Sequence, residues 1–136
     1  MEWLNLSAQE YRERFVNKNK PSSKYHNIKT TNNGIVFDSK KESDYFNTLK
    51  ALELSGKIKD LKLQHRFVLI EPFTDNSGIK ERGTSWVADF YYFDIEKDKY
   101  IAVDVKSSIT RKKPEYIIKR KLFKVKYPHI YFEEVL

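Results

Sequence analysis

Two neighbouring stretches decide the fold: Trp86-Val-Ala-Asp-Phe-Tyr-Tyr-Phe93 and Tyr100-Ile-Ala-Val-Asp-Val-Lys106. Both are short apolar runs rich in aromatic and β-branched residues, which is a pattern typical of β-strands. A short, mostly polar connection joins them, so we expect the two strands to form a hairpin. Because side chains alternate between the two faces of a strand, Asp104 and Lys106 point the same way, and Asp89 can lie beside them.

Asp89 and Asp104 are unusual residues inside such strands. A carboxylate in a half-buried strand is costly to bury unless it is paired or bound to a metal ion. Carboxylates are also the ligands that Mg²⁺ prefers. Two carboxylates that converge with Lys106 therefore predict a site for a divalent cation and a phosphodiester, as in a metal-dependent nuclease. The alternative is that Asp104 and Lys106 form a solvated ion pair, a contact that contributes little to stability.

Length and composition restrict the class of protein. The chain has 136 residues, which suits one domain, and 40% of them are hydrophobic, which argues against disorder. It contains no cysteine, which excludes disulfides, cysteine zinc sites and thiol nucleophiles and is compatible with a reducing cytoplasm. We expect no membrane span, because no apolar run is long enough, and no secretory signal.

The charge of the chain favours a polyanionic partner. The formal net charge is +7, and many basic residues cluster just after Lys106 or in the N-terminal third. Lysine and arginine contacts to phosphate supply most non-specific affinity for nucleic acids, although a basic run can also be a solvated helix face. The candidate nucleic-acid contacts are Lys24, Lys29, Lys40, Lys41, Arg111, Lys112, Lys113, Lys119, Arg120 and Lys121.

Hydrophobic periodicity, helix caps and turn residues predict the other elements along the chain. The expected order around the two quoted strands is helix, three strands, helix and strand, which gives a mixed sheet flanked by helices, of α/β (α+β) class. The expected ranges are a helix over 8–16, a basic arm over 17–34, a strand over 34–37, a helix ending near 55, a strand over 61–70, a polar loop over 71–83, a helix over 114–127 and a strand over 130–135.

Short signals define the ends of the two later helices. Asp38 or Ser39 is expected to cap the first of them, and Gly56 suits a left-handed C-terminal cap. Pro114 fits the first turn of the second. The apolar residues expected to face the core from this second helix are Ile117, Ile118, Leu122 and Val125.

Glu42 has two possible roles. It precedes Tyr45, Phe46 and Leu49 at helical spacing, so its side chain lies on the apolar stripe that faces the core and can point at Asp89 and Asp104. Alternatively, Ser39 and Glu42 form a capping box, in which the Glu42 side chain turns back to the backbone amide of Ser39. The local pattern leaves both open.

Other polar and aromatic residues are weaker candidates. Gln64 can reach the edge of the site, but a surface position on its strand is the better interpretation. His65 and His129 are expected to be structural or exposed to solvent, because a lone histidine needs partner ligands to bind metal. Tyr91 and Tyr92 can stack on bases, although aromatic residues in strands usually belong to the core.

A helix glutamate, a strand aspartate and a D-x-K triplet on the next strand resemble the PD-(D/E)xK nuclease superfamily. Residues 24–135 resemble more closely the phage-encoded Holliday-junction-resolvase-like family within it, and 24–136 is taken as the domain, with 1–23 as an additional helix and arm. The matching pieces are Lys24-Tyr-His-Asn27, Gly34-Ile-Val-Phe-Asp-Ser-Lys-Lys-Glu42, Ile58-Lys-Asp-Leu61, Ala88-Asp-Phe90, Val103-Asp-Val-Lys106 and Lys119-Arg-Lys-Leu-Phe123. One departure is Ala88, where the superfamily name has proline.

The resemblance implies a restriction-endonuclease-like αβββαβ core and a Mg²⁺-dependent DNA endonuclease, with Mn²⁺ able to substitute. In this reading Glu42, Asp89 and Asp104 bind the metal, the Val105 carbonyl is a further ligand, and Lys106 is the catalytic lysine. The implied substrate is branched DNA such as Holliday junctions in phage recombination or replication, cut by a homodimer in the cytoplasm of a bacterial host. A catalytically silent nucleic-acid-binding protein and a nuclease of RNA or of other DNA structures remain the alternatives.

Overall fold

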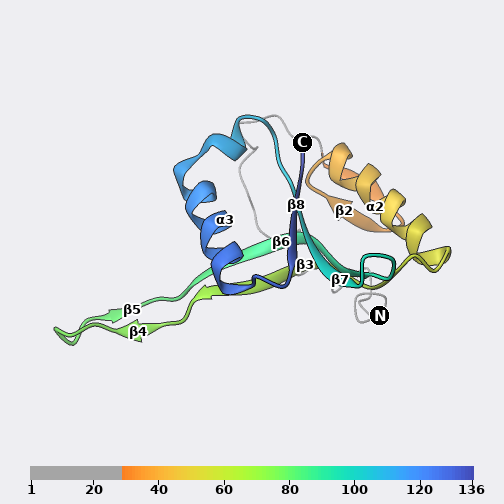
Figure 1. The fold of residues 1–136 in the computed structure, drawn as a ribbon. Helices are drawn as coiled ribbons and strands as arrows, with labels where there is room; N and C mark the ends of the chain where they lie inside the picture. Colours follow the sequence, from red (N-terminus) through yellow and green to blue (C-terminus); the bar gives the residue numbers. More distant parts are fainter. Residues whose placement is uncertain (1–28) are drawn as a thin grey trace.

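The computed structural model describes residues 29–136, so the predicted helix over 8–16 and most of the basic arm lie outside it. One sheet and two helices make up the body of the fold (Figure 1). The helices are α2 (Lys40–Leu54) and α3 (Pro114–Lys126), with a short 3-10 helix at Thr110–Lys112 before α3. The strands are β1 (Thr30–Asn32), β2 (Ile35–Phe37), β3 (Ile58–Ile70), β4 (Phe73–Thr74), β5 (Lys80–Glu81), β6 (Thr84–Asp94), β7 (Lys99–Val105) and β8 (Tyr131–Val135).

The main sheet has the order β3-β6-β7-β8 and is mixed. β3, β6 and β7 pair antiparallel, whereas β8 pairs parallel to β7. A parallel neighbour requires a crossover connection, and α3 supplies it. α2 and α3 lie on opposite sides of β8 in Figure 1. The prediction of a mixed sheet flanked by helices is therefore confirmed.

The ends of α2 follow the capping signals in the sequence. The Ser39 side chain accepts a hydrogen bond from the backbone N–H of Glu42 at 3.1 Å, which satisfies one of the free donors of the first turn. Gly56 adopts the left-handed conformation at φ 76°, and the N–H of Lys57 then reaches the carbonyl of Leu52 at 2.9 Å. These caps fix where α2 begins and therefore place Glu42 in its first turn.

Two clusters of buried residues form the core, one that includes residues of α2 and one that includes Phe123 of α3. The strands β3 and β6 contribute to both clusters: one part of each strand packs in the α2 cluster and the other part in the α3 cluster. From β3, Leu61 and Leu63 join the α2 cluster, while Phe67 and Leu69 join the α3 cluster. From β6, Phe90 and Tyr92 join the first and Trp86 and Ala88 the second. Gln64 on β3 and Asp89 on β6 lie between the residues of the two clusters.

The predicted loops and one predicted helix face were partly wrong. β1 lies inside the range expected to be an arm, and β4 and β5 form a two-stranded ribbon inside the expected loop over 71–83. In α3, Ile118 and Val125 are 58% and 81% exposed, while Tyr116 and Phe123 are buried. The large aromatic rings bury more apolar area than the aliphatic residues do, so they turn toward the sheet.

No helix within residues 29–136 combines the length and apolarity needed to cross a membrane.

Candidate functional site

The pairing between β6 and β7 ends at the pair Phe90 and Val103. Asp89 and Asp104 are the next residues of these two strands. The Asp89 side chain takes over the hydrogen bonding at this point, because its Oδ2 accepts from the backbone N–H of Val105 at 2.7 Å. This contact ties the carboxylate of one strand to the backbone of the next. The predicted proximity of Asp89 to the D-x-K triplet is thus present in the fold.

Asp104 is almost completely buried, with 1% of its surface exposed. Its Oδ1 lies 3.4 Å from Nζ of Lys106, which is on the same face as predicted. Its Oδ2 accepts a hydrogen bond from the indole N–H of Trp86 at 3.3 Å. Because each oxygen has its own donor, the orientation of this carboxylate is fixed.

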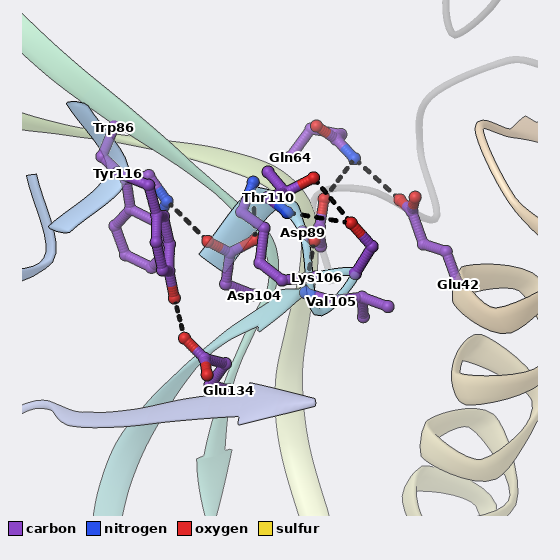
Figure 2. A network of polar contacts seen from close by, with 11 residues as sticks. Glu42, Gln64, Trp86, Asp89, Asp104, Val105, Lys106, Thr110, Tyr116 and Glu134 are labelled. Carbon is purple, nitrogen blue, oxygen red and sulfur yellow. Dashed lines mark hydrogen bonds and ion pairs between the residues drawn. The ribbon is translucent and has the colours of Figure 1, made fainter. Parts of the chain in front are cut away.

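Glu42 completes a group of three carboxylates from three elements. Its carboxylate is buried and accepts a hydrogen bond from Nε2 of Gln64 at 3.0 Å. Figure 2 shows the Glu42 side chain reaching from α2 toward Gln64 and Asp89. The backbone N–H of Glu42 donates to the Ser39 side chain, but the Glu42 side chain points into the site and accepts from Gln64. Of the two roles left open by the sequence, the side chain therefore takes the first.

Gln64 lies within the site, and the preference for a surface position was wrong. Its Nε2 also lies 3.4 Å from Oδ1 of Asp89, so one amide faces two carboxylates. A sequence signal was present: Gln64 interrupts an apolar strand and, in the antiparallel register, falls opposite Asp89, between the pairs Leu63–Phe90 and His65–Ala88.

Burial raises the pKa of all three acids, and repulsion by neighbouring carboxylates adds to this effect at Glu42 and Asp89. The pKa of Glu42 rises to about 7, first because of burial and then because of Asp38 and Asp104. Burial, followed by the charges of Glu42 and Asp104, raises the pKa of Asp89 well above its usual range. Burial also raises the pKa of Asp104, although Lys106 opposes this effect. The cluster therefore favours either protons or a cation.

A pocket of about 420 Å³ opens over two of these acids, Glu42 and Asp89, whereas Asp104 is not part of its lining. Glu42, Asp89, Val105 and Lys106 contribute to its wall. Residues that the sequence did not single out as pocket residues also line it: Asp38, Ser39, Ser107 and Thr110. The pocket gives a solute access to the carboxylates and to the lysine at the same time.

The donor set fits a hard divalent cation such as Mg²⁺, which prefers carboxylate oxygens and keeps some of its own water. Three buried like charges also need a positive partner, and Lys106 offsets only one of them. Within residues 29–136, no three acidic or imidazole groups already have the spacing of a metal site. Gln64 and the Val105 amide instead donate to Glu42 and Asp89.

Lys106 is embedded in a second set of contacts on the side of α3. Its Nζ lies 5.3 Å from the centre of the Tyr116 ring, within the range of a cation–π interaction. The Tyr116 hydroxyl donates to Glu134, and Glu134 also pairs with Arg111 at 3.0 Å. Tyr116 was not recognised in the sequence as a neighbour of the site, because its contacts depend on the packing of α3. The hydrogen bond of Trp86 to Asp104, which the sequence also did not reveal, joins the neighbouring strands β6 and β7.

The residues predicted to contact nucleic acid have different surroundings in the structure. Lys41 lines the pocket, and Arg120 lies 5.9 Å from the ring of Tyr116, beside the site. Arg111 and Lys119 face carboxylates, those of Glu134 and Glu115. Lys29, Lys40, Lys112, Lys113 and Lys121 are exposed, and Lys24 lies outside the described residues.

The weaker candidates belong to the body of the fold. His65 stacks on Tyr91, with ring centres 4.8 Å apart, and Tyr92 is buried in the core. His129 is exposed. Tyr92 is thus a core residue, and the structural or exposed positions predicted for the two histidines are confirmed.

Comparison with known proteins adds a family. The family profile described as "Protein of unknown function (DUF1064)" matches residues 22–135. The chain matched no curated protein and no solved structure.

Proposed function

Since the chain belongs to the DUF1064 family, described as proteins of unknown function, we propose a function from its site: a Mg²⁺-dependent DNA endonuclease that hydrolyses phosphodiester bonds. The observation that supports this proposal is the convergence of Glu42, Asp89 and Lys106 on one pocket, with the buried Asp104 in contact with Lys106. Carboxylates from a helix and two strands, with an ammonium group beside them, suit a cation and a phosphate together.

The element order also supports the proposal. The run α2, β3, β6, β7, α3, β8 has the αβββαβ order of a restriction-endonuclease-like core. This order, together with the positions of the acids, supports the proposal that the domain belongs to the PD-(D/E)xK superfamily. The ribbon formed by β4 and β5 is an insertion into that order, between the first and second strands of the sheet.

The three carboxylates would hold the cation. When bound, Mg²⁺ offsets charge on the phosphodiester and makes a neighbouring water more acidic. Glu42, Asp89 and Asp104 supply the negative oxygens, and Val105 can add a neutral carbonyl. Trp86 keeps Asp104 oriented through its indole N–H, so this ligand needs little reorganisation.

The hydrolysis joins a water oxygen to phosphorus and breaks the bond from phosphorus to one deoxyribose oxygen. The attacking water releases a proton and the leaving oxygen takes one, and solvent in the open pocket can accept the first and supply the second. Lys106 carries its positive charge at the pocket wall, 3.4 Å from Asp104. There it would donate to a phosphate oxygen and offset the charge that develops in the pentacoordinate transition state.

A nucleic acid is the substrate that the charge favours. The chain carries a net charge of +7, and basic side chains of α2 and α3 lie near the pocket, including Lys41 and Arg120. Branched DNA, a homodimer and the cytoplasm of a bacterial host complete the proposal by resemblance to resolvase-like nucleases.

The test is a cleavage assay on labelled DNA of matched sequence: four-way junction, flap, linear duplex and single strand. Each substrate is incubated with Mg²⁺ or with EDTA. The variants are Asp104→Asn and, as a control, Asp98→Asn, which makes the same change in an exposed turn. We expect Mg²⁺-dependent cutting that falls at least about 100-fold in Asp104→Asn and not in Asp98→Asn, with DNA binding kept in both.

Symmetric cuts confined to the junction would support the resolvase proposal. Equal cutting of all four DNAs would support a general nuclease. Tight DNA binding without cutting in Mg²⁺ or Mn²⁺ would contradict the enzyme and favour a silent binding protein, and cutting of matched RNA alone would change the substrate class.

A further inference from the structure

Gln64 has a backbone conformation that is rare for its residue type. Its φ is 51°, in the left-handed region, although it lies in the interior of β3. For a residue with a β-carbon this conformation costs about 1–2 kcal/mol. Such an outlier persists only where the surrounding structure holds it, and it is often found at functional sites.

The side chain of Gln64 explains what this conformation achieves. It lies 3.0 Å from Oε1 of Glu42 and 3.4 Å from Oδ1 of Asp89, measured from Nε2. The two acids come from different elements, α2 and β6, and their like charges repel each other when both are ionised. An amide NH₂ has two donors, so it can face both carboxylates at once. Figure 2 shows it between them.

Gln64 also lies between the part of β3 that packs in the α2 cluster and the part that packs in the α3 cluster. Leu63 joins the α2 cluster, and Phe67, at another odd-numbered position, joins the α3 cluster. A regular strand keeps such positions on one face. The left-handed residue lies between them, so the local distortion and the placement of the amide occur at one point of the chain.

We propose that Gln64 is a positioning residue for the metal site, which holds Glu42 and Asp89 together before a divalent cation binds. This inference rests on the proposed function, because it takes these acids as the metal ligands. The neutral amide lowers the repulsion between them and keeps Glu42 directed into the pocket. Without it, repulsion would move Glu42 on α2 away from Asp89, and the cation would have to bring the two acids back together.

The variants test the side-chain amide of Gln64 separately from its left-handed backbone conformation. Gln64→Gly and Gln64→Asn suit the left-handed conformation at least as well as glutamine does, but neither side chain can reach both acids. Gln64→Glu keeps the length and replaces the NH₂ donors by a further carboxylate. A matched control is Asp60→Gly, because Asp60 is the other left-handed residue of β3, at φ 56°, and is exposed.

The first measurement is binding of Mn²⁺ alone to the full chain by calorimetry, without DNA, together with thermal unfolding in EDTA. All variants should unfold cooperatively. We expect Gln64→Gly and Gln64→Asn to bind Mn²⁺ about 10–100-fold more weakly than wild type, the usual effect of losing a group that orients ligands. Asp60→Gly should bind Mn²⁺ like wild type. In cleavage, kcat should fall in the two Gln64 variants while KM for DNA changes little.

Gln64→Glu gives a second readout. Its added charge should make the pH dependence of Mn²⁺ binding steeper than in wild type, because one more carboxyl group must lose its proton. An unchanged pH dependence would show that the side chain at position 64 does not face the metal ligands.

Unchanged Mn²⁺ affinity in a folded Gln64→Asn protein would overturn the inference, and so would an equal loss in Asp60→Gly. If wild type binds Mn²⁺ but cuts no nucleic acid, the proposed nuclease fails, and the Mn²⁺ affinities of the variants still decide the role of Gln64. If wild type binds no Mn²⁺, both proposals fail.

Discussion

Lys106 is held by two neighbours of different character. Its ammonium group lies 3.4 Å from a carboxylate oxygen of Asp104 and 5.3 Å from the centre of the Tyr116 ring. Both contacts hold the ammonium group of this lysine at the wall of the pocket. Its proposed role depends on that charge rather than on its volume.

Replacement of Lys106 by methionine tests the charge directly. Methionine keeps an unbranched side chain over Tyr116 but cannot offset charge on a phosphate, so we expect kcat for DNA cleavage to fall on the order of 100-fold. The control is Lys97→Met, which also removes a lysine over a ring, that of Tyr131 at 5.7 Å. Steady-state kinetics should show the loss in the first variant only, and equal losses would count against the assignment.

Glu42 provides a test by pH in the metal-free protein. Burial raises the pKa of Glu42 from 4.5 to about 7, so the folded state holds this proton more tightly than the unfolded chain does. The stability that protonated Glu42 contributes is therefore fully present below the unfolded-state pKa of 4.5. It is lost as the pH rises through the folded-state pKa of about 7. Between about pH 5 and about pH 8, this loss should be on the order of 1–3 kcal/mol.

Glu42→Gln removes the ionisation and keeps a group that can accept from Gln64. Urea unfolding in EDTA at several pH values should show a smaller loss of stability with rising pH in the variant than in wild type. Identical pH profiles for the two proteins would show that Glu42 is not the group responsible.

At the scale of elements, α3 separates basic residues that are adjacent in sequence. Arg120 is one helical turn beyond the buried Tyr116 and lies 5.9 Å from its ring. Lys121 comes next in the chain and is exposed, because each residue of a helix turns about 100° from the last. The helix therefore directs Arg120 toward Tyr116, which also contacts Lys106, and Lys121 away from it.

We expect Arg120→Gln to weaken DNA binding and Lys121→Gln to leave it nearly unchanged. The loss of one phosphate contact should lower the slope of log affinity against log salt concentration by about 0.9. Fluorescence anisotropy with a labelled duplex over a range of salt concentrations measures both quantities. A larger effect of Lys121→Gln would place the DNA on the outer face of α3 instead.

At the scale of the whole molecule, residues 29–136 contain a four-stranded mixed sheet, two core clusters and the pocket. A chain shortened to residues 24–136 should therefore fold cooperatively. We expect its melting temperature, followed by circular dichroism, to lie within about 5 °C of the full chain, which corresponds to about 1 kcal/mol at this size. Loss of the cooperative transition would mean that residues 1–23 are part of the folding unit.

Local interactions made much of the fold predictable. Ser39 and Gly56 limit α2, and Pro114 starts α3, because caps act within a few residues of the chain. The same holds for Asp104 and Lys106, whose shared face follows from the period of a strand.

The sequence by itself thus determined the order of helices and strands, the mixed sheet and the strand positions of the acids, since these depend on neighbours along the chain. Only the tertiary structure decided that Gln64 faces Glu42 and Asp89, that the Glu42 side chain points into the pocket, and that Tyr116 rather than Ile118 is buried. These outcomes depend on how α2 and α3 pack against the sheet. Periodicity says which residues share a face of an element, but the packing of large side chains between elements decides which face is buried.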